Sequence, residues 1–215
     1  METVNFSYLH SERKRFIKTN SKKDHVVLSG KNNILLSAPH GVSQVRLGKP
    51  KAREIGSLTT ALYLQSETNS FLIAKTKNNF DDANFDKKCE YRKTLKKVIE
   101  ENNIKYVVDL HGLAKTRDCD INLGTHLGFN TSKNPKLLED LIKQFEKNGF
   151  VVCVDQPFMA GSRTISGYSK TLFPQIWSVQ IEINCDITNK RKNFEKYKKL
   201  LSVLKKWINS VSKAK

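Results

Sequence analysis

The chain has 215 residues, of which 38% are hydrophobic and 27% charged, a composition typical of a globular domain large enough to bury a core without disulfides. Every apolar run is shorter than the roughly 18 residues of a membrane helix. The opening METVNFSYLHSERKRFIKTNSKKD contains no apolar signal-peptide segment. The four cysteines form no CxxC pair. We therefore expect a single domain over residues 1–215, cytoplasmic, with reduced thiols and no membrane partner.

The net charge of +17 at pH 7 raises the question of a nucleic-acid partner. However, 30 of the 38 basic residues are lysines, and they are spread along the whole chain. Specific nucleic-acid readers use arginines and stacking aromatic side chains, and no segment of the sequence combines the two. We expect a solvated basic surface with no specific nucleic-acid partner, although weak, salt-sensitive binding to polyanions would follow from the charge.

Short apolar runs alternate with helical patterns along the chain. Buried strands are predicted at residues 26–28, 34–37, 71–74, 106–110, 151–154 and 177–183, and helices at residues 52–66, 91–102 and 136–148. A last helix shows one apolar stripe at spacings of three and four, made by Phe194, Tyr197, Leu201, Leu204, Ile208 and Val211. This alternation predicts an α/β fold with a mostly parallel or mixed central sheet and helices on both faces.

Three predicted strands end in polar residues, where open α/β sheets bind their ligands. ILLSAPHG ends with His40, VVDLHG contains Asp109 and His111, and VQIEIN contains Glu182. Strand alternation puts Asp109 and His111 on one face and sets Glu182 opposite two isoleucines. Because a glutamate is costly to bury without a partner, we expect Glu182 to face a polar cleft or a cation.

Two histidines, a carboxylate and an open position describe a catalytic zinc site. Such an ion lowers the pKa of bound water towards about 7, and a nearby glutamate can carry the proton. Asp109 is placed to accept the second ring N–H of His111, or to bind a neighbouring group. A single histidine after a strand also occurs as a structural or surface residue, but two His-Gly strand ends and an in-strand glutamate favour a site.

A series of motifs between residues 37 and 184 resembles the N-formylglutamate amidohydrolase-like family, which is related to phage poly-γ-glutamate hydrolases and zinc carboxypeptidases. In chain order they are SAPHG, Arg46, Glu54, DDANFD, VVDLHG, DINLGT, GSRTISGY and VQIEIN. The resemblance implies a zinc-dependent hydrolase with a carboxypeptidase-like α/β fold. It further implies cleavage of an amide next to a carboxylate, in a small acidic acyl-amino acid or glutamyl-type substrate.

The resemblance also implies roles for particular residues. His40 and His111 would bind zinc, and Glu182 would act as the general base and then as the acid that protonates the leaving amine. Carboxypeptidases use His-x-x-Glu, but here Ser43 stands three residues after His40. Glu54, at the start of the predicted helix that follows, resembles the family's glutamate after PHG and is the expected third ligand. Alternatively, Glu54 is an exposed first-turn carboxylate favoured by the helix dipole.

Anion recognition would come from arginines, since a guanidinium binds a carboxylate with two parallel hydrogen bonds. Arg163, in the glycine-bracketed GSRTISGY, is the first candidate and Arg46 the second; either could instead be a solvated surface residue. Asp82 and Asn84, in DDANFD, could orient the substrate or support the ligands. Asx residues also build turns by bonding to their own backbone, and this alternative is equally open.

Two other functions remain open at this stage. The basic surface could make the chain a non-enzymatic module that binds polyanions. The chain could also be a relative of the hydrolases that keeps the fold and has lost the chemistry, for which the departure at Ser43 leaves room.

Overall fold

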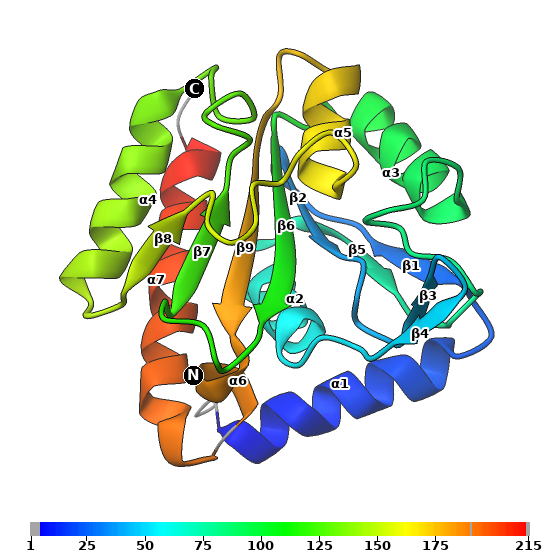
Figure 1. Cartoon of the computed structure of the whole chain (residues 1–215), viewed down its shortest axis with the longest axis horizontal. Coiled ribbons are helices and arrows are strands. Elements are labelled where there is room, and N and C mark those ends of the chain that lie inside the picture. Colours follow the sequence, from blue (N-terminus) through cyan, green and yellow to red (C-terminus); the bar gives the residue numbers. More distant parts are fainter. Residues whose placement is uncertain (1–4, 190, 214–215) are drawn as a thin grey trace.

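A mixed sheet forms the centre of the computed structural model, which describes residues 5–189 and 191–213. The strand order in this part of the chain is β1-β5-β2-β6-β9-β7-β8 (Figure 1). β5, β2, β6 and β9 run parallel to one another, whereas β1 is antiparallel to β5 and β7 is antiparallel to β9. The strands of the sheet are β1 (His25–Leu28), β2 (Ile34–Ala38), β5 (Phe71–Lys75), β6 (Tyr106–Leu113), β7 (Ile121–Gly124), β8 (Val152–Val154) and β9 (Trp177–Asn184). A separate hairpin pairs β3 (Gln44–Arg46) with β4 (Lys49–Lys51).

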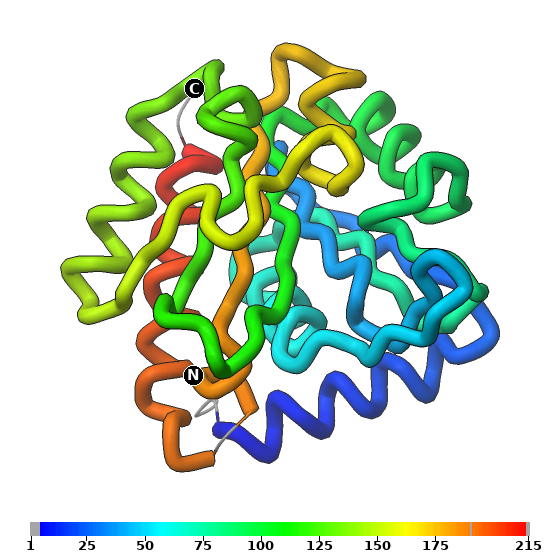
Figure 2. Tube along the Cα trace, in the orientation of Figure 1, coloured from blue at the N-terminus to red at the C-terminus, as the bar shows by residue number. Residues whose placement is uncertain are grey.

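Helices cover both faces of the sheet, as the tube in Figure 2 also shows. They are α1 (Phe6–Asn20), α2 (Ser57–Thr68), α3 (Glu90–Glu101), α4 (Pro135–Lys147), α5 (Ile165–Leu172), α6 (Cys185–Asn189) and α7 (Phe194–Lys213), with a 3₁₀ turn at Arg191–Asn193. Buried side chains of α1, α2, α4 and α7 join the larger core on one face, and those of α3 and α5 join the smaller core on the other. Among the described residues, no helix is both long and apolar enough to cross a membrane.

Strand alternation divides the two cores and creates a polar region in one of them. Leu36, Val108 and Ile181 face the larger core, and Leu35 and Val107 face the smaller one. Further along the same strands, the positions that continue the smaller-core face are polar and buried: Ser37, Asp109, His111, Gln180 and Glu182. The smaller core therefore turns polar towards the carboxyl ends of the parallel strands.

The structure confirms the predicted α/β fold and every predicted strand and helix, with shifted ends. The clearest error is the start of α2, predicted at residue 52 and found at Ser57. Gly56 precedes the helix with φ 92°, a left-handed conformation that suits glycine. Glu54 therefore lies in the connection before the helix, and its predicted place in the first helical turn is wrong. The ends of the predicted domain, residues 1–4 and 214–215, lie outside the described residues.

The helices α1, α5 and α6 and the strands β3, β4 and β7 were not predicted from the sequence. α1 carries many charged residues and buries only Leu9, so its apolar periodicity is weak. α5 has only eight residues, and Thr164 caps its N-terminus by accepting a hydrogen bond from the backbone N–H of Gly167. β7 has only four residues, and Asn122 and Gly124 interrupt its apolar run.

A buried lysine at the end of β5 is expected to be important for stability. Lys75 is 1% exposed and bonds to Asp81 and, at 2.8 Å, to Asp24. Burial lowers the pKa of Lys75, but its bonds to these two carboxylates outweigh that effect and raise the pKa overall. Lys75→Met should lower the free energy of unfolding by about 3–5 kcal/mol, because it leaves two carboxylates without their cation. Urea denaturation measures this loss.

Lys93→Met provides the matched control. Lys93 is an exposed lysine that pairs with Glu90 on α3, and because exposed ion pairs contribute little, its loss should leave the free energy of unfolding almost unchanged. If the two substitutions lowered the free energy of unfolding equally, the ion pairs of Lys75 with Asp24 and Asp81 would stabilise the fold no more than an exposed pair does.

Candidate metal centre and cleft

The two predicted ligand histidines lie next to each other at the carboxyl ends of neighbouring parallel strands. His40 follows β2, and His111 lies near the end of β6. Each is 1% exposed, and their rings meet edge to face with centroids 4.8 Å apart. β2 and β6 pair in parallel, with Ser37 opposite Asp109, so the two strands end at the same edge. The structure thus brings the two predicted ligand histidines together.

Glu54 lies between the two imidazoles. Its Oε1 is 2.6 Å from Nδ1 of His40, and its Oε2 is 2.9 Å from Nδ1 of His111. The backbone N–H of Gly112 also donates to Oε2 at 3.0 Å, and the backbone N–H of Glu54 donates to the carbonyl of His40 at 3.0 Å. A Cβ on Gly112 would lie 3.1 Å from Cβ of Glu54 and 3.0 Å from the carbonyl oxygen of Ile55. The glycine of the second His-Gly pair is thus the residue that lets Glu54 approach.

Each histidine is held from behind by an aspartate. Nε2 of His40 lies 2.8 Å from Asp82, and Nε2 of His111 lies 3.0 Å from Asp109. In the neutral imidazole, an N–H donated to the aspartate at Nε2 leaves the lone pair of Nδ1 available to bind a cation. Burial lowers the pKa of both imidazoles, but the surrounding carboxylates outweigh it and raise the pKa, most strongly for His111.

The donor set suits a cation. One ligand atom from each of His40, Glu54 and His111 lies within 4.8 Å of the others. Two imidazole nitrogens and a carboxylate oxygen are the ligands of catalytic zinc sites, which keep a fourth position open. Aspartates behind the histidines are the usual second partners of metal-binding imidazoles. The three side chains therefore form a candidate metal site.

The aspartate behind His111 continues into a buried chain of hydrogen bonds. Ser37 donates its hydroxyl to Asp109 at 2.8 Å, and the Ser37 and Tyr91 hydroxyls lie 3.0 Å apart. Tyr91 donates to the carbonyl of Ile73 at 2.9 Å. This chain links the site to the smaller core and fixes the position of Asp109. Sequence alternation placed Asp109 beside His111, but gave no sign of the role of Tyr91.

Asp82 combines the two roles that the sequence left open. Its carboxylate binds His40 and also accepts hydrogen bonds from Nε of Arg46 at 2.7 Å and from the backbone N–H of Asn84 at 2.9 Å. It therefore builds an Asx turn and supports the candidate ligand at once. Asn84 accepts a hydrogen bond from the backbone N–H of Ile165 at 2.7 Å, and so joins its loop to α5.

Glu182 lies on β9 beside the metal site. It pairs in register with His111 on β6 and is 5% exposed. The side-chain amide of Gln180 donates to its Oε1 at 2.8 Å. Burial raises the pKa of Glu182 to about 7. A carboxyl with this pKa can gain and lose a proton near neutral pH, as general acid–base chemistry requires.

One cleft of about 520 Å³ joins the predicted residues. His40, Arg46, Glu54, Asn84, His111, Arg163 and Glu182 all line it, and Asp82 lies behind His40. The sequence placed Gln180 on the same strand face as Glu182; the lining residues that it did not indicate are Lys51, Phe85, Gly112, Ala114, Arg117, Pro157, Phe158, Met159, Ala160, Gly161 and Thr164. Most of these come from loops, where neither strand alternation nor helical periodicity gives a signal.

The two predicted anion-binding arginines meet at one aromatic ring. The guanidinium carbons of Arg163 and Arg46 lie 5.0 Å and 5.2 Å from the ring centroid of Phe85. Arg163 is exposed, and its backbone carbonyl accepts a hydrogen bond from Arg92. Arg46 is half-buried and bound through Nε to Asp82. Phe85 therefore marks a cationic end of the cleft.

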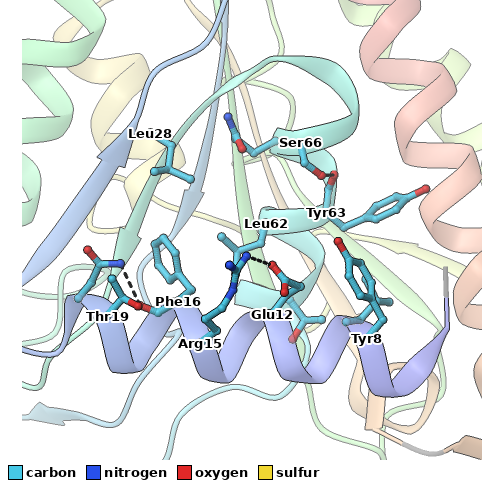
Figure 3. A pocket seen from close by; sticks show the side chains of 13 residues that line it. Tyr8, Glu12, Arg15, Phe16, Thr19, Leu28, Leu62, Tyr63 and Ser66 are labelled. Atoms are coloured by element: carbon cyan, nitrogen blue, oxygen red, sulfur yellow. Dashed lines mark hydrogen bonds and ion pairs between the residues drawn. The ribbon is translucent and has the colours of Figure 1, made fainter. Parts of the chain in front are cut away.

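A second hollow, of about 410 Å³, lies between α1, β1 and α2 (Figure 3). Its walls include Tyr8, Phe16 and Tyr63, and its charged residues, Glu12 and Arg15, bind each other at 2.5 Å. None of the candidate ligands lines this hollow. The cleft at the carboxyl ends of the strands is therefore the candidate active site.

Known structures share this fold. An N-formylglutamate amidohydrolase from Ralstonia eutropha JMP134 superposes with a TM-score of 0.64 at 12% identity, over 88% of this chain and 97% of that one. A bacteriophage poly-gamma-glutamate hydrolase gives a TM-score of 0.54 at 13% identity, over 87% and 89%. A metallo-carboxypeptidase from Burkholderia cenocepacia gives 0.53 at 9% identity, over 94% and 69%. The fold is thus that of the zinc carboxypeptidases, as predicted.

In sequence, residues 89–188 match the N-formylglutamate amidohydrolase family. The predicted resemblance is thereby confirmed. The matched part contains His111, Arg163 and Glu182, whereas His40 and Glu54 lie before it. No curated protein sequence matches the chain.

Proposed function

We propose that the chain is a zinc-dependent amidohydrolase that cleaves the amide of an N-acyl amino acid or glutamyl-type substrate. The observation that carries the proposal is the convergence of His40, Glu54 and His111 on one point, with Glu182 beside them in the same cleft. The family match and the shared fold support a hydrolase. The completeness of the cluster favours an active enzyme over a relative that has lost its chemistry.

The candidate residues divide the chemistry between them. Zinc held by His40, Glu54 and His111 would supply Lewis acidity, polarising the amide carbonyl and lowering the pKa of a water molecule. Glu182 accepts the proton of the attacking water and returns it to the leaving amine. The hydrogen bond from Gln180 orients the Glu182 carboxylate for both transfers.

The cationic end of the cleft selects the substrate. Arg163 has its exposed guanidinium beside Phe85 and binds the carboxylate of the amino acid. Arg46 contributes positive charge to the same end while its Nε supports Asp82. The printed names of two structural neighbours, an N-formylglutamate amidohydrolase and a poly-gamma-glutamate hydrolase, fit a substrate that contains glutamate.

Release of free amine from N-acyl-glutamates tests the proposal. Protein supplied with zinc should hydrolyse N-formyl- or N-acetylglutamate, and removal of zinc by a chelator should abolish turnover until zinc is returned. The corresponding N-acyl-lysines, which place a cation near Arg163, should be much poorer substrates. Absence of turnover on every acyl-amino acid tried, in protein that holds zinc, would reject the proposed activity.

Arg163→Met tests the carboxylate contact. The loss of a charge-assisted hydrogen bond of about 1.5–3 kcal/mol should raise KM for an acyl-glutamate about 10- to 100-fold, with a smaller change in kcat. Arg163→Lys should recover part of the affinity, because it restores the charge without the planar fork. Arg15→Met on α1, outside the cleft, is the control. An unchanged KM in Arg163→Met would assign the carboxylate to another residue.

A further inference from the structure

A short apolar segment forms one wall of the cleft. Pro157, Phe158 and Met159 follow β8, and all three line the cleft. Phe158 is 41% exposed and Met159 42% exposed. Scattered apolar side chains are common on protein surfaces, but here three stand in sequence on the wall of a cleft that also contains a candidate metal site.

The backbone of this segment is held firmly against β7. The N–H of Phe158 donates to the side-chain oxygen of Asn122 at 3.2 Å, and the carbonyl of Met159 accepts from the backbone N–H of His126 at 2.5 Å. A Cβ on Gly124 would lie 3.0 Å from the carbonyl oxygen of Phe158, so backbone and strand are in close contact. The exposed side chains of Phe158 and Met159 are therefore attached to a backbone that is held in place.

The same contacts place the segment beside the candidate general base. Asn122 of β7 is the register partner of Glu182 on β9, and both side chains are buried. The residue that binds the N–H of Phe158 is thus the direct lateral neighbour of Glu182. An apolar group that leaves the reaction centre in this direction meets Phe158 and Met159.

The cationic end of the cleft lies in the other direction. Phe85, which the two arginines approach, belongs to the connection after β5. In the sheet, β5 and β2 lie on one side of β6 and β9, whereas β7 and β8 lie on the other (Figure 1). Arg46 and Phe85 thus belong to connections that follow β2 and β5, and Arg163 reaches that end of the cleft through its contact with Phe85, whereas Pro157, Phe158 and Met159 follow β8.

An amide substrate has two sides, and the cleft offers a different chemistry to each. The amino-acid carboxylate belongs at the arginines, so the acyl group extends from the scissile carbonyl towards β7 and β8. The whole cleft, of about 520 Å³, is in the size range that takes a drug-sized ligand, so it has room for a substrate that reaches both ends. We propose that Pro157, Phe158 and Met159 form an acyl subsite, which selects N-acyl amino acids with an apolar acyl chain of several carbons.

This inference rests on the proposed function, and binding measurements separate the two. The probes are N-formyl-, N-acetyl-, N-butyryl- and N-hexanoylglutamate, titrated by calorimetry into zinc-supplied protein carrying Glu182→Gln, which prevents turnover during the titration. Each methylene that leaves water should strengthen binding about three- to fourfold. Affinity should therefore rise at least about tenfold from the formyl to the hexanoyl compound.

Two substitutions and a control identify the surface responsible. Phe158→Ser and Met159→Ser should each flatten the dependence on chain length, with little change in the binding of the formyl compound. Both side chains are partly exposed, so the fold should tolerate their loss. Leu127→Ser removes a leucine that is 78% exposed and does not line the cleft, and it should leave the chain-length dependence intact.

The outcomes distinguish the subsite from the activity. Turnover of N-formylglutamate by the wild type, with no gain in affinity for longer chains, would reject the subsite and keep the proposed function. Tight binding of the hexanoyl compound that Phe158→Ser weakens, with no turnover by the wild type, would keep the subsite and reject the function. A protein that binds none of the four compounds would overturn both.

Discussion

Replacement of Glu182 by glutamine is expected to lower the turnover of an acyl-glutamate about 10²- to 10⁴-fold while the zinc content stays unchanged. The amide has nearly the shape of the carboxylate but cannot accept the proton of the attacking water. Glu182 is not one of the three residues of the candidate metal site, so its substitution leaves all three metal ligands in place. Steady-state kinetics and metal analysis on the same preparation measure both quantities.

The control for this substitution is Glu12→Gln. Glu12 lies on α1 and pairs with Arg15 outside the cleft, so its loss should alter neither turnover nor zinc content. If Glu182→Gln kept more than about a tenth of the wild-type turnover, another group would have to carry the proton, and the assignment of Glu182 would be wrong.

Replacement of Glu54 by glutamine is expected to remove most of the bound zinc. Glu54 supplies the negative charge between the two imidazoles, and its carboxylate oxygens lie 2.6 Å and 2.9 Å from their Nδ1 atoms. A neutral amide is a poor ligand for zinc compared with a carboxylate. We expect stoichiometry to fall from about one zinc per chain to a small fraction after dialysis against a weak chelator, with turnover falling in parallel.

The comparison with Asp109→Asn sharpens this prediction. Asp109 holds His111 from behind, and loss of such a partner lowers metal affinity about 10- to 100-fold. Glu54→Gln should therefore lose more zinc than Asp109→Asn at the same chelator concentration. Full zinc retention in Glu54→Gln would exclude Glu54 as a ligand and reopen the search for the third donor.

The site residues that lie on strands could be predicted from the sequence, because successive side chains of a strand always point to opposite faces of the sheet. Asp109 and His111 share a face two residues apart, and a glutamate among isoleucines has to face something polar. Parallel strands also end at one edge of the sheet, which places His40 near His111. The core-facing stripe of α7 was predicted for the same reason, since helical spacing is equally regular.

The remaining parts of the site depend on loops, and sequence spacing does not determine how loops fold. Glu54 was recognised through the family resemblance, but its place before α2 follows from the left-handed Gly56. The two roles of Asp82 arise because its loop brings one carboxylate to His40 and Arg46 together. Phe158 reaches the cleft because its backbone binds Asn122 on β7, a strand that shows no continuous apolar run in the sequence.

Anomalous scattering at the zinc absorption edge, from crystals of protein supplied with zinc, tests the central claim most directly. The claim predicts one strong peak at about 2.0–2.2 Å from Nδ1 of His40, Nδ1 of His111 and a carboxylate oxygen of Glu54. The same peak should disappear in crystals of Glu54→Gln. A zinc peak elsewhere, or none at these three side chains, would contradict the assignment of this cluster as the metal centre.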